Sequence, residues 1–375
     1  MAAKRAFIIL GMHRSGTSSV AGALTLLGAA APKTLMAAAA DNPKGFFESR
    51  LVGELNDSIL HAAGSSWDDW RRFEPDALQP EAVTAFREQI RTTLQHEFGY
   101  DALVVLKDPR LCRIYPIWET VLAEEGYQAE FVLPIRSPLE VARSLNRRNG
   151  MPIATGLLLW LRHVLDGEKL TRFKRRRILL WRAFMQDWRT EITSIQQALN
   201  WNAEITDAHA RDVDGFLSTD LRHEVVADDA LNVDPEAHAW AREVYAALAA
   251  LSAGDDDAVH LATLDRVGSV FEASCQLYGR AYQPLVRRVK ELEAECSELV
   301  AKAQSASSSG LGATPLEPRQ DAGQARVNEA RTLTAELLRR ASLGSPDVFE
   351  WALQRSGTHV QRIRRVRESF VPDNE

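Results

Sequence analysis

The sequence predicts an α/β protein of three layers (α/β/α), in which helices cover both faces of a mainly parallel sheet. Four short apolar runs have the length and composition of buried strands, at residues 6–10, 102–106, 131–135 and 178–181. Between these runs the apolar residues recur at the three- and four-residue spacing of helices. Strands that alternate with helices build parallel sheets, because each helix returns the chain to the same edge.

The first strand, 6–10, leads through a glycine-containing turn into a helix at about 18–27, where Val20, Leu24 and Leu27 share one face. Further helices are predicted at about 51–60, 80–98, 115–125, 153–169 and 184–199, and then at 236–252 and 257–280. A helix that carries Ser144 follows the third strand, and a helix breaker at 149–152 comes after it. The segment from Thr206 to Pro235 is acidic and rich in turn-forming residues, so we expect a loop there.

The C-terminal part differs in character from the main domain, which we expect to span residues 1–283. Apolar residues from Leu285 to Ala303 alternate spacings of four and three, which predicts a short coiled-coil-like helix over 284–304. Residues 305–324 have the composition of a flexible linker, and 325–375 should form a helical segment. This helical extension, 285–375, is where we expect a partner or a second copy to bind. Its arginine-rich stretch, 354–367, could bind an acidic partner or an anionic membrane face, but the charge pattern favours a solvated helix face.

Composition excludes several classes of function. The chain has 45% hydrophobic and 26% charged residues, which is ordinary for a globular protein, and a net charge of −6 argues against nucleic-acid binding. Its three cysteines are odd in number and far apart, so they predict neither a disulfide framework nor a metal cluster. We find no apolar run near the ~18 residues that span a bilayer and no secretion signal, so we expect a cytoplasmic protein.

The turn after the first strand predicts an anion site. In Gly11-Met12-His13-Arg14-Ser15-Gly16-Thr17-Ser18 the two glycines have the G-x-x-x-x-G spacing of a phosphate-binding loop (P-loop). A helix that starts at such a turn directs its N–H groups and positive dipole end at an anion. The lysine that nucleotide hydrolases carry after the second glycine is replaced by Thr17, and Arg14 supplies a cation earlier in the turn.

Three motifs together resemble the bacterial sulfotransferases that use 3′-phosphoadenosine 5′-phosphosulfate (PAPS). The turn Gly11–Ser18 resembles the 5′-phosphosulfate loop of that family. The stretch 131–145 resembles its 3′-phosphate motif, in which Arg136 and Ser144 match the phosphate-binding positions. Leu106-Lys107-Asp108-Pro109-Arg110 matches a third motif of the bacterial members. The resemblance covers about residues 5–225 and implies a P-loop fold and an enzyme.

The resemblance implies a role for each matched residue. Arg14 would contact the phosphosulfate and the leaving oxygen, Lys107 would add a second positive charge, and Glu48 would be the base that takes the acceptor's proton. The amides of Ser15, Gly16, Thr17 and Ser18 would hold the 5′-phosphate, while Arg136 and Ser144 would hold the 3′-phosphate. The product would be adenosine 3′,5′-bisphosphate, and no metal is expected.

Other assignments remain open on the sequence alone. His13 and His61 are alternatives to Glu48 as the base, and Lys107 could simply pair with Asp108. Trp67 and Trp70 suit either an acceptor pocket or core packing, and the stretch 216–223 suits either a nucleotide lid or a surface loop.

The function itself also has alternatives. The acceptor would be a hydroxyl of a carbohydrate or glycolipid, with protein tyrosine as the alternative. A P-loop kinase would use Ser18 and Asp108 to hold Mg²⁺. A docking protein would act through residues 285–375.

Overall fold

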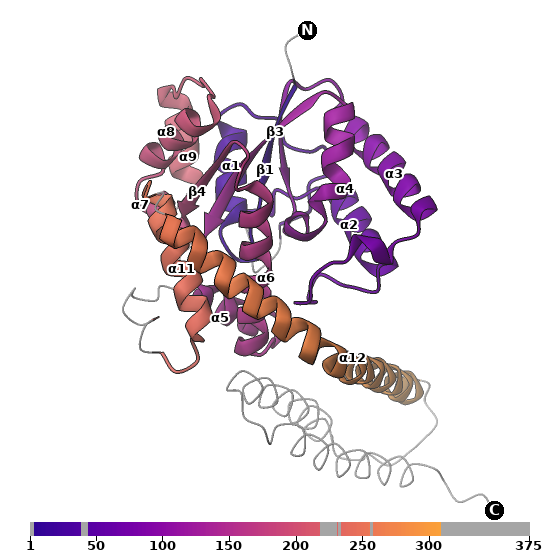
Figure 1. Ribbon diagram of the computed structural model, residues 1–375. Coiled ribbons are helices and arrows are strands. Elements are labelled where there is room, and N and C mark those ends of the chain that lie inside the picture. The colour runs from indigo at the N-terminus through magenta and orange to yellow at the C-terminus, as the bar shows by residue number, and fades with distance from the viewer. Residues whose placement is uncertain (1–3, 39–43, 218–230, 232–233, 256–257, 309–375) are drawn as a thin grey trace, which may run out of the picture. The chain divides into compact units, whose positions relative to one another are not determined.

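The computed structural model describes residues 4–38, 44–217, 231, 234–255 and 258–308 (Figure 1). The chain forms two compact units, Met1–Tyr282 and Gln283–Glu375. The sheet and every residue of the candidate site belong to the first unit. Among the described helices, none is both long enough and apolar enough to cross a membrane.

A four-stranded parallel sheet in the order β2-β1-β3-β4 lies at the centre of the first unit. The strands are β1 (Lys4–Ile9), β2 (Leu103–Lys107), β3 (Tyr127–Ile135) and β4 (Arg176–Leu180). The chain leaves β1 toward β2 on one side and continues to β3 and β4 on the other. Such a reversal of strand order opens a ligand-binding crevice at the carboxyl ends of the strands, here beside β1.

Helices pack on both sides of this sheet. They are α1 (Thr17–Leu26), α2 (Arg50–Ala62), α3 (Pro80–Phe98), α4 (Leu111–Glu124), α5 (Pro138–Asn149), α6 (Ile153–Thr171), α7 (Trp181–Gln186), α8 (Trp188–Leu199), α9 (Asp207–Phe216), α11 (Ala239–Ser252) and α12 (Ala258–Ser308), with a 3₁₀ turn at Pro75–Ala77. The three-layer α/β arrangement predicted from the sequence is therefore confirmed.

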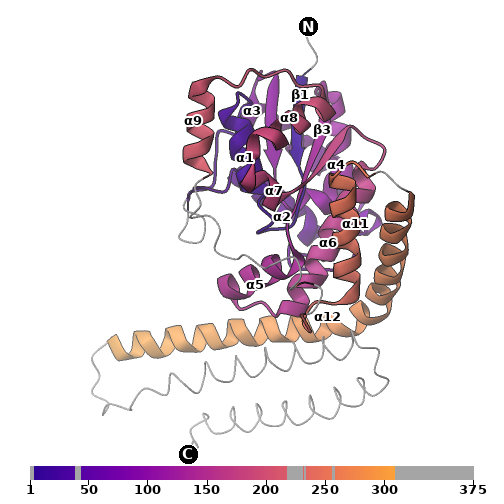
Figure 2. The same cartoon turned by 90° about the vertical axis from the view of Figure 1, so that its left-hand side faces the viewer.

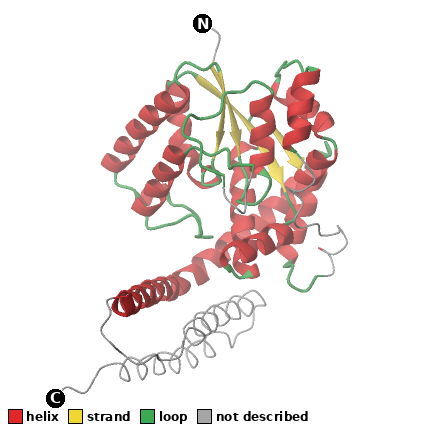
Figure 3. Ribbon diagram, turned by 180° about the vertical axis from the view of Figure 1, so that it is seen from behind, coloured by secondary structure: helices red, strands yellow, loops and turns green. Residues whose placement is uncertain are grey.

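The two faces of the sheet follow the two-residue alternation of β1. Phe7 and Ile9 belong to one core with α1 and α8, whereas Ala6 and Ile8 belong to a second core with α2, α4 and α6. Ala6, Phe7, Ile8 and Ile9 are all fully buried, which explains why the strand is apolar at each of these four positions, after Lys4 and Arg5 at its start. Figure 2 shows α9 beside α1 on the first side, and Figure 3 shows the strands between the two helix groups.

The region after β4 differs from the prediction. Trp181 was predicted to end the fourth strand, but β4 ends at Leu180 and Trp181 begins α7. The single helix predicted for 184–199 is two helices, because Asp187 interrupts the helix with an extended backbone and caps α8 by accepting a hydrogen bond from the Thr190 amide, 3.2 Å.

Two further segments differ from the prediction. Helix α9 occupies part of the predicted loop 206–235. Thr206 caps it by accepting from the His209 amide, 3.2 Å, and Val213 anchors it in the core. Its acidic, glycine-containing sequence left only a weak helical pattern, because Val213 is the one buried residue of the helix. The predicted helices 257–280 and 284–304 form one continuous helix, α12, which extends to Ser308. The packing of the coiled-coil seam, residues 309–324 of the linker, and the segment 325–375 lie outside the described residues.

Candidate functional site

The turn between β1 and α1 has a backbone suited to an anion. Gly16 precedes α1 in the left-handed region at φ 81°, and Arg14 also has a positive φ of 70°. No side chain caps α1, so the first N–H groups of the helix point out of the turn without an intrahelical partner. The Ser15 amide, expected to hold the 5′-phosphate, instead donates to the Met12 carbonyl at 3.1 Å.

Trp181 packs directly on this turn and explains the need for Gly16. A Cβ atom at Gly16 would lie 1.8 Å from Cδ1 of the Trp181 ring. Only glycine therefore fits, both for its positive φ and for the ring beside it. The Trp181 indole Nε1 is buried and has no hydrogen-bond partner among the described residues. Trp181 was missed as a site residue, although it follows a strand at the edge where Lys107 and Arg136 were expected.

The side chains of Arg14, Arg136 and Ser144 meet at the carboxyl ends of β1 and β3. The Arg14 Nε donates to Ser144 Oγ at 2.9 Å, and Nη1 of Arg136 donates to the Arg14 carbonyl at 3.0 Å. Arg136 directly follows β3, and Ser144 is buried on α5, the helix that comes next. Arg14 is thus in direct contact with two residues that follow it in the chain by 122 and 130 positions, Arg136 and Ser144.

A buried ion pair and an aromatic ring hold Arg136. Its Nε donates to Glu140 one helical turn later, 2.6 Å, and its guanidinium lies 4.1 Å from the centre of the Trp181 ring. Burial lowers the pKa of Arg136, and Glu140 opposes that shift. These groups line a crevice of only about 10 Å³, which holds about one water molecule. Ser137 lies at the same crevice, and its hydroxyl is buried with no partner among the described residues.

Lys107 and Glu48 form a second group beneath the start of α1. Both are buried, at 3% and 5% exposed, and the Lys107 ammonium makes an ion pair with the Glu48 carboxylate. The same ammonium donates to Ser18 Oγ at 3.2 Å and to the Phe46 carbonyl at 2.9 Å. An ammonium has three N–H donors, so all of those of Lys107 are engaged by protein oxygens.

Asp108 forms its ion pair with Arg110 and not with the adjacent Lys107. Its carboxylate is fully buried, accepts from the Arg110 amide at 2.8 Å, and pairs with the Arg110 guanidinium at 3.0 Å. Burial raises the pKa of Asp108, Arg110 opposes the shift, and Glu48 adds to it. Asp108 is thus paired with Arg110, and Lys107 is paired with Glu48, not with its sequence neighbour Asp108.

The two histidines weighed as alternative bases occupy different environments. His61 is exposed in the last turn of α2. His13 is partly buried within the turn, and its ring lies edge-to-face on Trp67 with the ring centres 5.1 Å apart. Burial lowers the pKa of His13 well below its ordinary value, and Arg110 and Lys107 act in the same direction.

Trp67 and Trp70, the two tryptophans considered for an acceptor pocket, also lie in different environments. Trp70 is a packing residue, because it is 6% exposed, its carbonyl accepts from Arg162 Nε at 2.9 Å, and its ring lies against Tyr282. Trp67 is only partly buried and faces His13. The described part of the stretch 216–223 is Phe216 and Leu217, and the rest lies outside the described residues.

Phe216 packs on the first helix, at the side of the turn. Its ring lies edge-to-face on Phe47 with the ring centres 5.3 Å apart, and a Cβ atom at Gly22 of α1 would lie 2.3 Å from it. Lys44 donates to the Gly215 carbonyl at 3.0 Å and joins the same two segments. The end of α9 and the segment before Glu48 therefore pack together on α1, a contact that sequence spacing could not reveal.

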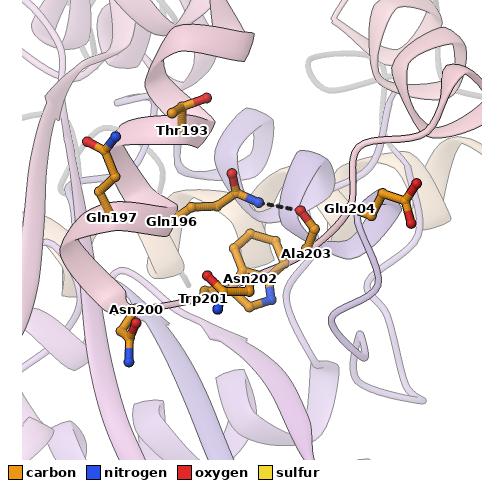
Figure 4. A pocket seen from close by; sticks show the side chains of 8 residues that line it. All are labelled: Thr193, Gln196, Gln197, Asn200, Trp201, Asn202, Ala203 and Glu204. Atoms are coloured by element: carbon orange, nitrogen blue, oxygen red, sulfur yellow. Dashed lines mark hydrogen bonds between the residues drawn. The ribbon is translucent and has the colours of Figure 1, made fainter.

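A larger cavity, about 580 Å³, lies at the opposite edge of the sheet (Figure 4). Polar side chains at the end of α8 line it, among them Gln196, Asn200 and Asn202. Arg5 at the start of β1 donates to the Leu199 carbonyl at 2.6 Å and so holds this segment at the amino ends of the strands. The size of a cavity therefore does not identify the candidate site, because the charged groups lie at the carboxyl ends of the strands and not beside this cavity.

Comparisons with known proteins add little to this geometry. No family model matches the chain, and no curated protein matches it. Among solved structures, the chain is distantly similar to the sulfotransferase domain from the Synechococcus PCC 7002 olefin synthase, at 18% sequence identity and a TM-score of 0.37. The match covers 60% of this chain and 91% of that domain. A functional assignment must therefore rest on the site.

Proposed function

We propose that this protein is a sulfotransferase that moves a sulfuryl group from PAPS to a hydroxyl acceptor. The observation that carries the proposal is the contact of Arg14 with Ser144 and of Arg136 with the Arg14 backbone. Two motifs far apart in the chain, which we assign to the two phosphorylated ends of the nucleotide, lie within hydrogen-bond distance of each other at a topological switch point. A general P-loop does not require the second motif.

The nucleotide would bind with its 5′ end on the uncapped start of α1 and its 3′-phosphate on Arg136 and Ser144. The buried Ser137 hydroxyl and Trp181 indole N–H, which lack partners among the described residues, add two donors beside Arg136. Since the crevice there is small, Trp181 and Arg136 must change rotamer for the 3′-phosphate to enter. The Glu140 carboxylate, which pairs with Arg136, would then exchange places with the phosphate.

In the transfer step the acceptor oxygen attacks sulfur, the bond from sulfur to the 5′-phosphate oxygen breaks, and the acceptor's proton passes to a base. Arg14 would stabilise the charge on the sulfuryl and leaving oxygens. Lys107 would act through its charge, because its three donors are engaged by Glu48, Ser18 and Phe46. Glu48, held in place by Lys107, is the proposed base. The described residues contain no group of three or more potential metal ligands.

The acceptor is proposed to be a carbohydrate or glycolipid hydroxyl, with a protein tyrosine as the alternative. Residues 285–375 are proposed to contact a partner or a second copy. For a kinase, Asp108 would have to bind Mg²⁺ beside Ser18, and its ion pair with Arg110 disfavours that use.

The test is transfer of labelled sulfate from PAPS to host glycans and acidic tyrosine peptides by the full chain. We expect PAPS-dependent labelling and release of adenosine 3′,5′-bisphosphate. Glu48→Gln should abolish turnover while nucleotide binding persists. The matched control is Glu54→Gln, an exposed carboxylate on α2 paired with Arg50. Normal turnover of Glu48→Gln would remove Glu48 from the role, and Mg²⁺-dependent ATP turnover without PAPS binding would restore the kinase assignment.

A further inference from the structure

Two histidine rings near the anion-binding turn have a ring nitrogen without a partner. Nε2 of His13 in the turn and Nε2 of His163 on α6 are both buried and have no hydrogen-bond partner among the described residues. His163 is among the groups that lower the pKa of His13, and it is the deeper of the two residues at 1% exposed. A buried polar atom without a partner is costly, so such atoms mark places where a ligand or water belongs.

Both rings are neutral near pH 7. Burial lowers the pKa of His163 to about 3, and burial also lowers the pKa of His13. Nδ1 of His163 lies 2.8 Å from the Leu159 carbonyl and must donate to it, so Nε2 of His163 carries a lone pair and requires a donor. Nε2 of His13 accepts or donates according to its tautomer. A hydroxyl group satisfies either ring, whereas a carboxylate cannot pair with His163.

The charges near His13 are largely compensated within the protein. Lys107 pairs with Glu48, and Arg110 pairs with Asp57 and Asp108. Arg148, at the end of α5, also acts on His13. The pairing of Lys107 and Arg110 with these carboxylates weakens the attraction that the two cations would otherwise exert on an acidic peptide at His13.

Trp67 is the aromatic residue that lies next to His13. Its ring is only partly buried and lies edge-to-face on His13. Sugar rings combine an apolar face with peripheral hydroxyl groups, so an aromatic ring next to neutral hydrogen-bonding groups suits them. Trp70, three residues further along, is buried in the core and serves as a packing residue instead.

We propose that His13 and Trp67, with His163 behind them, form the acceptor subsite and that it binds a neutral sugar ring. Because Nε2 of His13 is buried, the His13 or Trp67 ring must turn for one sugar hydroxyl to reach it, and the apolar face of the sugar ring then lies against Trp67. This inference rests on the proposed sulfotransferase function and names its acceptor class. His13 and Trp67 bind the acceptor directly, and Glu48 keeps the role of base.

The experiment measures ligand binding to the full chain saturated with adenosine 3′,5′-bisphosphate. The probes are methyl glycosides of glucose, galactose and N-acetylglucosamine, with an acidic tyrosine peptide for comparison. The binding of each probe is measured by saturation-transfer NMR. We expect a glycoside to bind and the peptide not to. His13→Ala and Trp67→Ala should each weaken glycoside binding about tenfold, whereas His13→Gln, which keeps a hydrogen-bonding group, should weaken it about threefold at most.

The nucleotide affinity of each variant, measured by calorimetry, separates this proposal from the proposed function. We expect it to change less than about twofold in Trp67→Ala and in the control His209→Ala, a substitution on α9. If the wild-type chain binds the nucleotide but no glycoside, or if both alanine variants bind the glycoside as tightly as wild type does, the acceptor subsite is wrong. If the wild-type chain binds no nucleotide, the sulfotransferase assignment itself fails.

Discussion

At the scale of single residues, the buried ion pair of Lys107 and Glu48 is the interaction that matters most for both stability and the proposed chemistry. Their side chains are 2% and 6% exposed, so neither charge is compensated by water. Removing one partner leaves the other buried and unpaired, which costs more than the pair itself contributes. The pair thus couples the stability of the fold to the group proposed to take the acceptor's proton.

Lys107→Met should lower the free energy of unfolding by about 3 kcal/mol, measured by urea denaturation. The double variant Lys107→Met/Glu48→Leu should recover most of that loss, because it removes both charges and keeps similar volume. Equal stability of the single variant and wild type would show that the two side chains are solvated and not paired.

His163 should make stability depend on pH. Its folded pKa of about 3 lies below the ordinary unfolded value near 6.5, so only the unfolded chain binds this proton between those pH values. Stability is therefore fully present above about pH 6.5 and falls as the pH decreases toward 3, by about 1.4 kcal/mol per pH unit for one proton.

His163→Gln should remove that contribution. Between pH 6 and 4.5 we expect the unfolding free energy of wild type to fall more steeply than that of the variant. The difference in slope should be close to the value for one proton, about 1.4 kcal/mol per pH unit. Carboxylates contribute equally to both proteins and cancel in the difference. Parallel curves would mean that His163 is protonated in the folded protein.

At the scale of elements, the β1–α1 turn depends on Gly16 for two separate reasons, its φ of 81° and its contact with Trp181. Gly28, after α1, has a positive φ of 103° but open space around it. Gly28→Ala should therefore cost only about 1 kcal/mol of backbone strain. Gly16→Ala should cost more and should weaken binding of adenosine 3′,5′-bisphosphate at least about tenfold, because the ring or the turn must move.

The pair of glycine variants is checked by urea denaturation and calorimetry together. If Gly16→Ala behaves like Gly28→Ala in both measurements, Trp181 does not lie on the turn. A loss of stability in Gly16→Ala without loss of nucleotide affinity would instead show that the turn is not the anion site.

Element types were largely predictable, because the four apolar runs are short and isolated and the helices have strong periodicity. The failures have local causes. At Trp181 an apolar run continued past the last strand residue, and apolarity alone does not distinguish a strand end from the first turn of a helix. At Asp187 the side chain could equally cap a helix or lie within one. At α9 a short helix with one core residue left a weak pattern.

At the scale of the whole molecule, the sheet topology brings the motifs together. Parallel strands place the residues after β1, β2 and β3 at one edge, so the proximity of Arg14, Lys107 and Arg136 followed from the fold class. The hydrogen-bond and ion-pair partners of these residues could not be predicted from the fold class. The pairing of Lys107 with Glu48 and of Asp108 with Arg110 depends on side-chain directions, and Trp67 reaches His13 across a loop whose path the sequence pattern does not define.

The central claim is that the turn and the Arg136–Ser144 pair hold the two phosphorylated ends of one nucleotide. Calorimetry of the full chain with adenosine 3′,5′-bisphosphate and with adenosine 5′-phosphate tests it, because the two ligands differ only in the 3′-phosphate. We expect the bisphosphate to bind at least about tenfold more tightly, and Arg136→Met to abolish the difference while Arg189→Met, an exposed arginine on α8, preserves it. Equal affinities for the two ligands, or no binding of either, would contradict the assignment.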